Sequence, residues 1–326
     1  MEQQTTRRRR RETAETPIKY GVGGWLAKPP RDPITALHFV GRGFEIALDP
    51  AMNEFRIGRA FPPDVDVHVP FGIVSRQHAT LRRDGEGLRV SDGGSQNGTS
   101  TAYLNEQRTW RHIANQEGPK LHAGDRLYLG SIQARALDDR GRQLVELLSR
   151  WMPRENYRAV DAAVEAILVQ RPLVLNDTRA KYVEELARGI HALSDRREFP
   201  FTVIEKPPGL PRTFDKVFTR AGCGVVFIDL WKTPKLPRRF LEALLSKHYH
   251  LWPMFVGHTE ELDLDLRVAL SRGQHVPHYQ PIEISFPEEV RERFCQENPI
   301  ETPRPPARRR PARTSGRKPK LQKRDR

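Results

Sequence analysis

The chain has only two cysteines among 326 residues, Cys223 and Cys295, and it has no long apolar run. Two cysteines cannot form a disulfide framework or the paired spacing of a zinc site, and they are typical of a reducing cytosol. No apolar run approaches the roughly eighteen residues of a membrane span. The stretch after Arg7–Arg11 is too short and glycine-rich for the core of an export signal. We therefore expect a cytoplasmic protein with no membrane contact, metal or cofactor.

Positive charge is concentrated at the two ends of the chain. The formal net charge is +14, of which residues 1–19 carry +3 and residues 301–326 carry +9. The body between them, residues 20–300, carries only +2. A folded nucleic-acid-binding face would place its charge within the body. The tails can still attract nucleic acid or acidic proteins without sequence specificity.

Composition and periodicity divide the chain into four segments. Residues 1–34 and 300–326 are rich in charge or proline, which predicts disordered basic tails. Residues 35–138 contain short alternating runs such as "FEIAL" and "VDVHV" between turn clusters, a pattern typical of a β-sandwich or barrel. In residues 141–299, apolar runs such as "PLVLN" and "GVVFID" alternate with helical periodicity. That alternation predicts an α/β domain whose parallel sheet is covered on both faces.

Four sequence blocks in the β-rich segment carry a family resemblance. They are "IGR" (57–59), "VSRQHATL" (74–81), "SQNGT" (95–99) and "LHAGDRLYLG" (121–130). In this order and spacing they resemble the forkhead-associated (FHA) domain, an all-β sandwich that binds phosphothreonine peptides. The phosphate group of phosphothreonine carries about −1.5 to −2 charge. A site that binds it needs a guanidinium, a hydroxyl and amide donors that converge from loops.

The resemblance also implies a role for each candidate binding residue. Arg59 and Ser75 would contact the phosphate with help from Arg76. Asn97 would hold the backbone of the bound peptide, and Thr99 would shape the pocket for the threonine methyl group.

Three further residues of these blocks are expected to be structural. Gly58 and Gly98 are expected to be turn glycines with positive φ. His78 follows Ser75 by three residues, as a base might follow a nucleophile, but no acidic residue or nucleophile elbow accompanies them. We therefore expect a structural histidine and no catalytic residue.

The α/β half, from about 155 to 290, resembles the AAA+ module of bacterial sigma-54 activators. The stretch "ELARGIHALSDRREFPF" is similar to the family's helix after the P-loop and to the residues that follow this helix. The stretch "AGCGVVFIDLWKTPKLPRRFLEALL" is similar to the Walker B strand and its following helix, and "FVGHTEELD" resembles the sensor strand.

The nucleotide site of that module is degenerate in this sequence. A P-loop needs glycines to wrap phosphates and a lysine to contact them. Counted back from "ARGIH", the loop falls on residues 177–184, "DTRAKYVE", which has no glycine. Val183 occupies the lysine position, and Lys181 is two residues out of register. Asp177 would place negative charge at a helix N-terminus, where it repels phosphate.

The Walker B strand shows a second loss. It keeps Asp229, but Leu230 replaces the glutamate that would orient the attacking water. The sigma-contacting loop of the family is also missing. These departures predict a pseudo-ATPase, with a generic α/β domain and an active ATPase as the alternatives.

Together these features predict a bacterial signalling adaptor rather than an enzyme. Its partner would be a phosphothreonine-containing protein, either a Ser/Thr kinase or a kinase substrate. Phosphorylated Thr13 or Thr16 in the N-terminal tail is a second candidate ligand, bound in cis. The alternative is a transcription-associated regulator that contacts DNA or the transcription machinery through its basic tail and AAA+-like half.

Overall fold

The structure is a computed structural model, and its described residues form two successive regions. They are residues 32–104, 110–114, 120–152, 157–176, 180–205, 211–230, 232, 236–244, 251–257 and 282–285. Both regions belong to one compact unit, Met1–Pro287. Both tails lie outside the described residues, as do Thr13, Thr16 and Cys295. Among the helices described, none has the length and apolar character needed to span a membrane.

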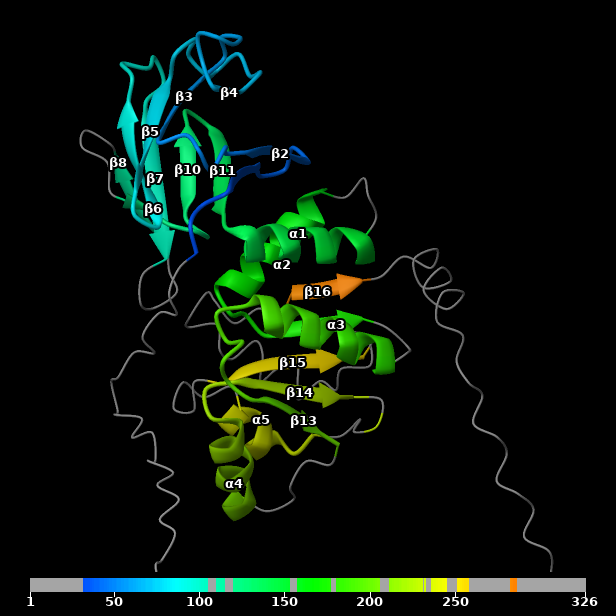
Figure 1. Ribbon diagram of the computed structural model, residues 1–326. Helices are drawn as coiled ribbons and strands as arrows, with labels where there is room; N and C mark the ends of the chain where they lie inside the picture. The colour runs from blue at the N-terminus through cyan, green and yellow to red at the C-terminus, as the bar shows by residue number, and fades with distance from the viewer. Residues whose placement is uncertain are drawn as a thin grey trace, which may run out of the picture. The chain divides into compact units, whose positions relative to one another are not determined.

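The first region is a sandwich of two β-sheets (Figure 1). One sheet has the order β2-β1-β11-β10-β7-β8 and the other β4-β3-β5-β6-β9. Only the short β3–β4 pair among the described pairings of these sheets is parallel. The strands are β1 (Ala36–Phe39), β2 (Phe44–Ala47), β3 (Glu54–Gly58), β4 (Val67–His68), β5 (Ala79–Asp84), β6 (Gly87–Asp92), β7 (Thr99–Leu104), β8 (Trp110–Ala114), β9 (Lys120–Leu121), β10 (Arg126–Leu129) and β11 (Ile132–Leu137).

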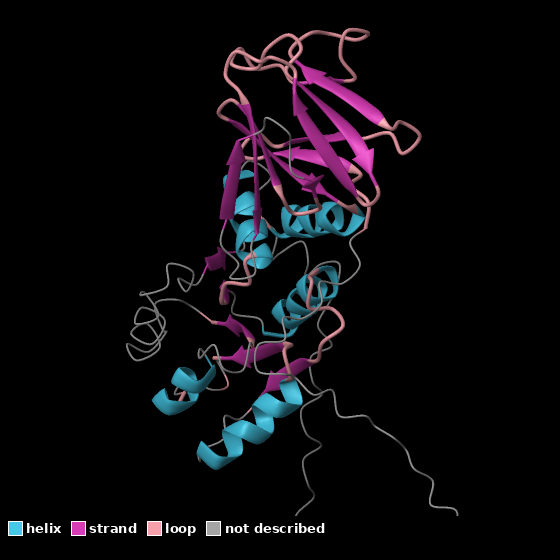
Figure 2. Ribbon diagram, turned by 90° about the vertical axis from the view of Figure 1, so that its left-hand side faces the viewer, coloured by secondary structure: helices cyan, strands magenta, loops and turns pink. Residues whose placement is uncertain are grey.

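Alternating side chains explain why these strands form a sandwich. In β3, Phe55 and Ile57 are buried while Glu54 and Arg56 are exposed. Both sheets contribute such inward residues to one core that includes Phe39, Leu81, Val90 and Leu127. The predicted sandwich is therefore confirmed, and several of the loops between its strands lie at the end that is uppermost in Figure 2.

The second region is built on a parallel sheet with the order β13-β14-β15-β12-β16. Its four described pairings are all parallel. The strands are β12 (Leu173–Asn176), β13 (Phe201–Ile204), β14 (Val225–Asp229), β15 (Trp252–Val256) and β16 (Ile282–Ser285). The helices are α1 (Asp139–Trp151), α2 (Tyr157–Leu168), α3 (Ala180–Leu193), α4 (Pro211–Ala221) and α5 (Arg238–Leu244).

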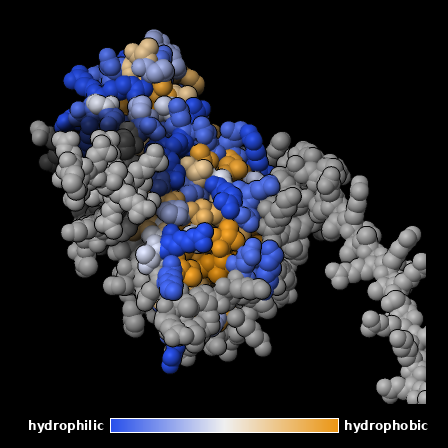
Figure 3. All heavy atoms as spheres, turned by 60° about the horizontal axis from the view of Figure 1, so that its bottom comes forward, coloured by the Kyte–Doolittle hydropathy of each residue, from blue (hydrophilic) through white to orange (hydrophobic). Residues whose placement is uncertain are grey.

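Both faces of this sheet are buried, as the continuous apolar runs predicted. Alternate residues of a strand point to opposite faces. Val226 and Ile228 of β14 pack in a cluster with Phe218 of α4 and Phe240 of α5. Their neighbours in β14 are buried as well, so every residue of that strand is inaccessible. At the surface, apolar and polar side chains lie side by side on the face shown in Figure 3.

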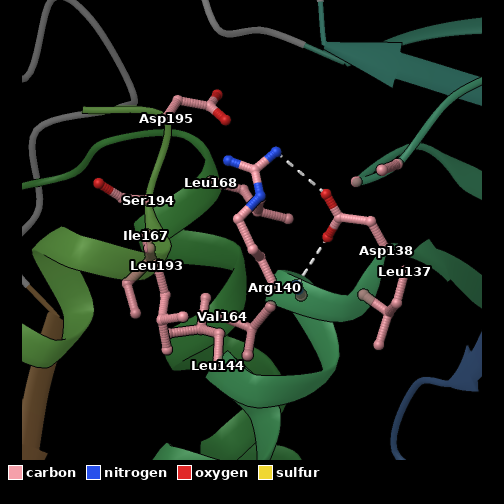
Figure 4. Close-up of a pocket in the computed structure, with 13 residues that line it drawn as sticks. Leu137, Asp138, Arg140, Leu144, Val164, Ile167, Leu168, Leu193, Ser194 and Asp195 are labelled. Carbon is pink, nitrogen blue, oxygen red and sulfur yellow. Dashed lines mark hydrogen bonds and ion pairs between the residues drawn. The ribbon is translucent and has the colours of Figure 1, made fainter. Parts of the chain in front are cut away.

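Helix α1 starts directly after the sandwich because Asp138 caps it. Asp138 Oδ1 accepts a hydrogen bond from Gly141 N at 2.7 Å, and Arg140 Nη2 donates to Oδ2 at 3.2 Å (Figure 4). Burial raises the pKa of the Asp138 carboxyl above its ordinary value, although these contacts oppose the shift. The same residues line a small pocket with Ser194 and Asp195 at the end of α3.

Helix α2 carries two acidic residues that bind the sandwich. Asp161 is 5% exposed, and its Oδ1 lies 2.6 Å from His38 Nε2 of β1. Its Oδ2 accepts from Gly41 N in the β1–β2 turn. Glu165 pairs with the buried Arg135 of β11 at 2.6 Å. No sequence pattern indicates this contact between the sandwich and the first helices of the α/β region.

Candidate functional site

The candidate site begins where β3 ends beside the β4–β5 loop. Arg59 N donates to Ser75 O at 2.9 Å, and Ala60 N donates to Arg76 O at 3.0 Å. The exposed side chain of Arg59 donates its Nε to Val74 O at 3.2 Å. These bonds hold a guanidinium, a hydroxyl and a second arginine in adjacent positions.

Gly58 permits this approach of the two loops. A Cβ on Gly58 would lie 2.0 Å from Arg76 O, a distance that no real Cβ tolerates. Its φ is not positive, so the expectation of a left-handed turn glycine is wrong for Gly58. The same expectation is confirmed for Gly98, whose φ is +73°. Gly58 is needed for close backbone contact rather than for an unusual dihedral angle.

The β6–β7 loop brings the third part of the site. Gln96 N donates to Ser75 Oγ at 3.0 Å, and Asn97 Nδ2 donates to Ile73 O at 2.7 Å. Ser75 is therefore tied to the loops on both sides of it. Asn97 is exposed, and its bond to Ile73 O holds it beside the β4–β5 loop that carries Ser75 and Arg76.

His78 is a fully buried bridge between two of these loops. Ser75 N donates to His78 Nδ1 at 3.0 Å, so Nδ1 must be the unprotonated nitrogen. Nε2 then carries the proton and donates to Gly98 O at 3.1 Å. Because both ring nitrogens are engaged with the backbone, His78 cannot act as a base toward the Ser75 hydroxyl.

Asp92, which the sequence analysis missed, organises the β6–β7 loop. Its carboxylate accepts from Gly94 N, Ser95 N, Ser95 Oγ and Thr99 Oγ1 at 2.5–3.0 Å. Burial raises the pKa of Asp92, but the hydrogen bonds from Ser95, Thr99 and Gly94 outweigh it and hold the pKa below 3.8. An aspartate followed by "GGS" is the sequence signal of such a side-chain-capped turn.

Thr99 is turned into the fold by this contact. It is 6% exposed, and its hydroxyl donates to Asp92 Oδ1 at 2.5 Å. The five candidate binding residues, Arg59, Ser75, Arg76, Asn97 and Thr99, are therefore brought together by three mutually bonded loops. One guanidinium held by a carbonyl, a second exposed arginine and nearby amide donors suit a dianionic group.

Two of the residues expected to form a degenerate nucleotide site, Val183 and Leu230, have apolar surroundings. Val183, at the lysine position, is completely buried in α3. Leu230 packs against Gly257. A Cβ built on Gly257 would lie 3.1 Å from the Cβ of Leu230. Asp177 and the side chain of Lys181 lie outside the described residues.

Asp229, at the end of β14, is 4% exposed and has a cationic neighbour. Lys232 Nζ lies 3.4 Å from Asp229 Oδ2, and Lys232 N donates to Oδ1 at 3.3 Å. The carboxylate that would help to hold Mg²⁺ in an ATPase thus faces a lysine of its own chain. Within the part of the chain that the structure describes, no cluster of His, Cys, Asp or Glu side chains is placed to hold a metal ion.

Comparison with known proteins identifies the sandwich. Residues 55–130 match the family model described as FHA domain, and the chain carries such a domain. Protein FraH of Nostoc sp. is 38% identical over 91 residues, which are 26% of this chain and 29% of FraH. The matched part therefore spans less than a third of the length of that relative.

Solved structures show further likenesses. The FHA domain of the CT664 protein from Chlamydia trachomatis is 20% identical and has a TM-score of 0.26, with 32% of this chain and 95% of that chain covered. EmbR of Mycobacterium tuberculosis, in complex with a low affinity phosphopeptide, is 23% identical with a TM-score of 0.26. That match covers 32% of this chain and 24% of EmbR.

Proposed function

We propose that this chain is a phosphothreonine-peptide-binding signalling adaptor. The observation that carries the proposal is the convergence of Arg59, Ser75 and Asn97 from three loops of an FHA domain. The phosphate would bind the Arg59 guanidinium and the Ser75 hydroxyl, with Arg76 adding positive charge. Asn97 would bind the peptide backbone. Thr99 would set the shape of the pocket from within the fold.

Replacing Arg59 tests this proposal directly. Each hydrogen bond to a charged group is worth about 1.5–3 kcal/mol, so Arg59→Ala should weaken phosphopeptide binding by about tenfold to a hundredfold. The measurement is titration calorimetry of the full chain with a phosphothreonine peptide library and with the same peptides unphosphorylated.

Arg82→Ala is the matched control, because it removes an equal charge from an exposed arginine that pairs with Glu54 in the same sheet. It should leave binding unchanged. Equal binding of phosphorylated and unphosphorylated peptides, or an Arg59→Ala variant that binds as well as Arg82→Ala, would refute the proposal.

For the α/β region we propose a non-catalytic, AAA+-like scaffold for protein interactions. The buried Val183 supports it, because this position then has no lysine to contact the phosphates of ATP. The Asp229–Lys232 pair also supports it, because the carboxylate that would bind the metal ion is already paired with a lysine. We expect no saturable heat when the full chain is titrated with Mg·ATP. ATP hydrolysis by the full chain that Asp229→Asn abolishes would overturn the pseudo-ATPase proposal and leave the FHA proposal intact.

The proposed partner is a phosphothreonine-containing protein of a Ser/Thr kinase pathway in the cytoplasm. The N-terminal tail phosphorylated at Thr13 or Thr16 is a second proposed ligand of the same site, in cis. Nucleic acid is a proposed non-specific partner of the basic tails.

A further inference from the structure

The turn between β1 and β2, residues 40–43, lies at the same end of the sandwich as the candidate phosphopeptide site. Phe39, the last residue of β1, pairs with Ala134 of β11. The β10–β11 turn that leads to Ala134 contains Gly130, and Gly130 N donates to Gly98 O of the β6–β7 loop at 2.9 Å. The β1–β2 turn and the loops of the site are therefore neighbours across the ends of the strands.

Two glycines make the β1–β2 turn conformationally permissive. Gly41 and Gly43 both have positive φ, +69° and +67°. Glycine adopts this region without strain, but it adopts other regions as readily. A turn with two glycines therefore needs contacts from other elements to stay in one conformation. Such contacts come from helix α2 and from the β4–β5 loop.

Helix α2 supplies the first set of contacts. Asp161 Oδ2 accepts a hydrogen bond from Gly41 N, and Asp161 Oδ1 lies 2.6 Å from His38 Nε2. The ring of Tyr157 covers Gly43 so closely that a Cβ built on this glycine would lie 2.5 Å from the ring. Helix α2 therefore holds both glycines of the turn.

The β4–β5 loop supplies the second contact. The Arg42 side chain, between the two glycines, places its Cζ 4.8 Å from the centroid of the Phe71 ring. Phe71 O accepts a hydrogen bond from Val74 N at 2.9 Å, and Val74 O accepts one from Arg59 Nε at 3.2 Å. A continuous series of contacts therefore leads from α2 through the turn to the guanidinium of the phosphate site.

We propose that α2 regulates the phosphothreonine site. When α2 holds the β1–β2 turn, the turn orders the β4–β5 loop in advance, and the chain binds its phosphopeptide more tightly. This inference rests on the proposed function. Coupling between two sites is reciprocal, so a bound phosphopeptide must also hold α2 more firmly on the turn. Because α2 also contacts β16 of the parallel sheet, peptide binding is communicated to the α/β region.

Tyr157→Ala tests this inference without removing a residue of the phosphate site. Tyr157 is 48% exposed, so its loss frees the turn but does not open the core. The affinity of the full chain for a labelled degenerate phosphothreonine peptide library is measured by fluorescence anisotropy, with the unphosphorylated library as reference. We expect the variant to bind about fivefold more weakly than the wild type.

Tyr103→Ala is the matched control for Tyr157→Ala. Tyr103 is also a partly exposed tyrosine, but it lies on β7, where it pairs with Arg111 of β8. This variant should bind the library as tightly as the wild type does.

A double-mutant cycle with Arg42→Ala separates coupling from loss of charge. Arg42 joins the turn to Phe71, so in its absence Tyr157→Ala should weaken binding no further. If the two substitutions instead act independently and their effects multiply, the turn does not carry the coupling and the inference is wrong.

Hydrogen exchange of the full chain measures the reciprocal effect. With a saturating amount of the tightest-binding library peptide, the Gly41 amide, which donates to Asp161, should exchange about fivefold more slowly than without peptide. In Arg42→Ala the peptide should not slow this exchange.

The outcomes distinguish this inference from the proposed function. If phosphate-dependent binding is found, but Tyr157→Ala binds as tightly as Tyr103→Ala or the peptide leaves exchange at Gly41 unchanged, the inference is wrong while the proposed function stands. If no peptide binds in a phosphate-dependent way, the proposed function fails and the inference fails with it.

Discussion

Gly58 lies where the backbone of β3 meets the β4–β5 loop, and it offers a sharp test at the scale of one residue. A Cβ there would overlap Arg76 O, so Gly58→Ala must push apart the loops that carry Arg59 and Ser75. Overpacking of this kind costs about 1–3 kcal/mol. We expect lower stability in urea denaturation and weaker phosphopeptide binding in the same variant.

Gly72 provides the control for Gly58. It lies in the β4–β5 loop, its φ is not positive, and nothing lies within 4 Å of a Cβ built on it. Gly72→Ala should change stability by less than about 0.5 kcal/mol. Equal stability of the two alanine variants would show that the loops can separate freely, which would contradict the role given to Gly58.

At the scale of one loop, Asp92 holds the β6–β7 turn that presents Asn97. Replacement by asparagine keeps the shape but weakens four charge-assisted bonds. The side chain is partly exposed, so we expect Asp92→Asn to cost only about 1–2 kcal/mol of unfolding free energy. Asp64→Asn, in the exposed β3–β4 loop, is the control and should cost much less.

The stabilisation by Asp92 should also depend on pH. The pKa of Asp92 is lowered in the folded protein, so its contribution is complete above the ordinary value of 3.8. The contribution disappears as the pH falls through the folded-state pKa. The difference in unfolding free energy between the wild type and Asp92→Asn should therefore be constant near neutral pH and shrink in acid. A difference that grows in acid would contradict this account.

The elements that could be predicted from sequence are those set by local periodicity. Alternation in "EFRIG" and the buried run "VVFID" each correspond to a strand with the expected burial. Asp92 was overlooked because it lies outside the four family blocks, although its hydroxyl partners, Ser95 and Thr99, lie within one of them. The expected reason for the glycine at position 58, a positive φ, was wrong. The sequence does not show which distant carbonyl a glycine at the end of a strand approaches.

At the scale of the whole molecule, the feature that sequence did not predict is the contact of α2 with the sandwich. From sequence alone, an aspartate in an amphipathic helix is expected to face solvent. Asp161 is buried instead because His38 and Gly41, 123 and 120 residues earlier in the chain, supply its partners. Such a pairing depends on tertiary structure and leaves no periodic signal.

This contact predicts that the sandwich depends on α2 for part of its stability. Asp161→Ala would leave the buried His38 ring and Gly41 N–H without their acceptor, at a cost of about 2–4 kcal/mol. The β1–β2 hairpin should then exchange amide hydrogens faster than in the wild type. Urea denaturation and hydrogen exchange of the full chain measure the two effects.

Glu146→Ala is the control for Asp161, because Glu146 is also an acidic helix residue with a cationic partner, Arg150, but it is 61% exposed. Exposed pairs contribute about 0–1 kcal/mol, so this variant should be close to the wild type. If Asp161→Ala is as stable as Glu146→Ala and the hairpin exchanges no faster, the contact does not stabilise the sandwich. If the expected difference is found, α2 belongs to the folding unit of the FHA domain. A fragment that ends at residue 138 would then be a poorer phosphopeptide binder than the full chain.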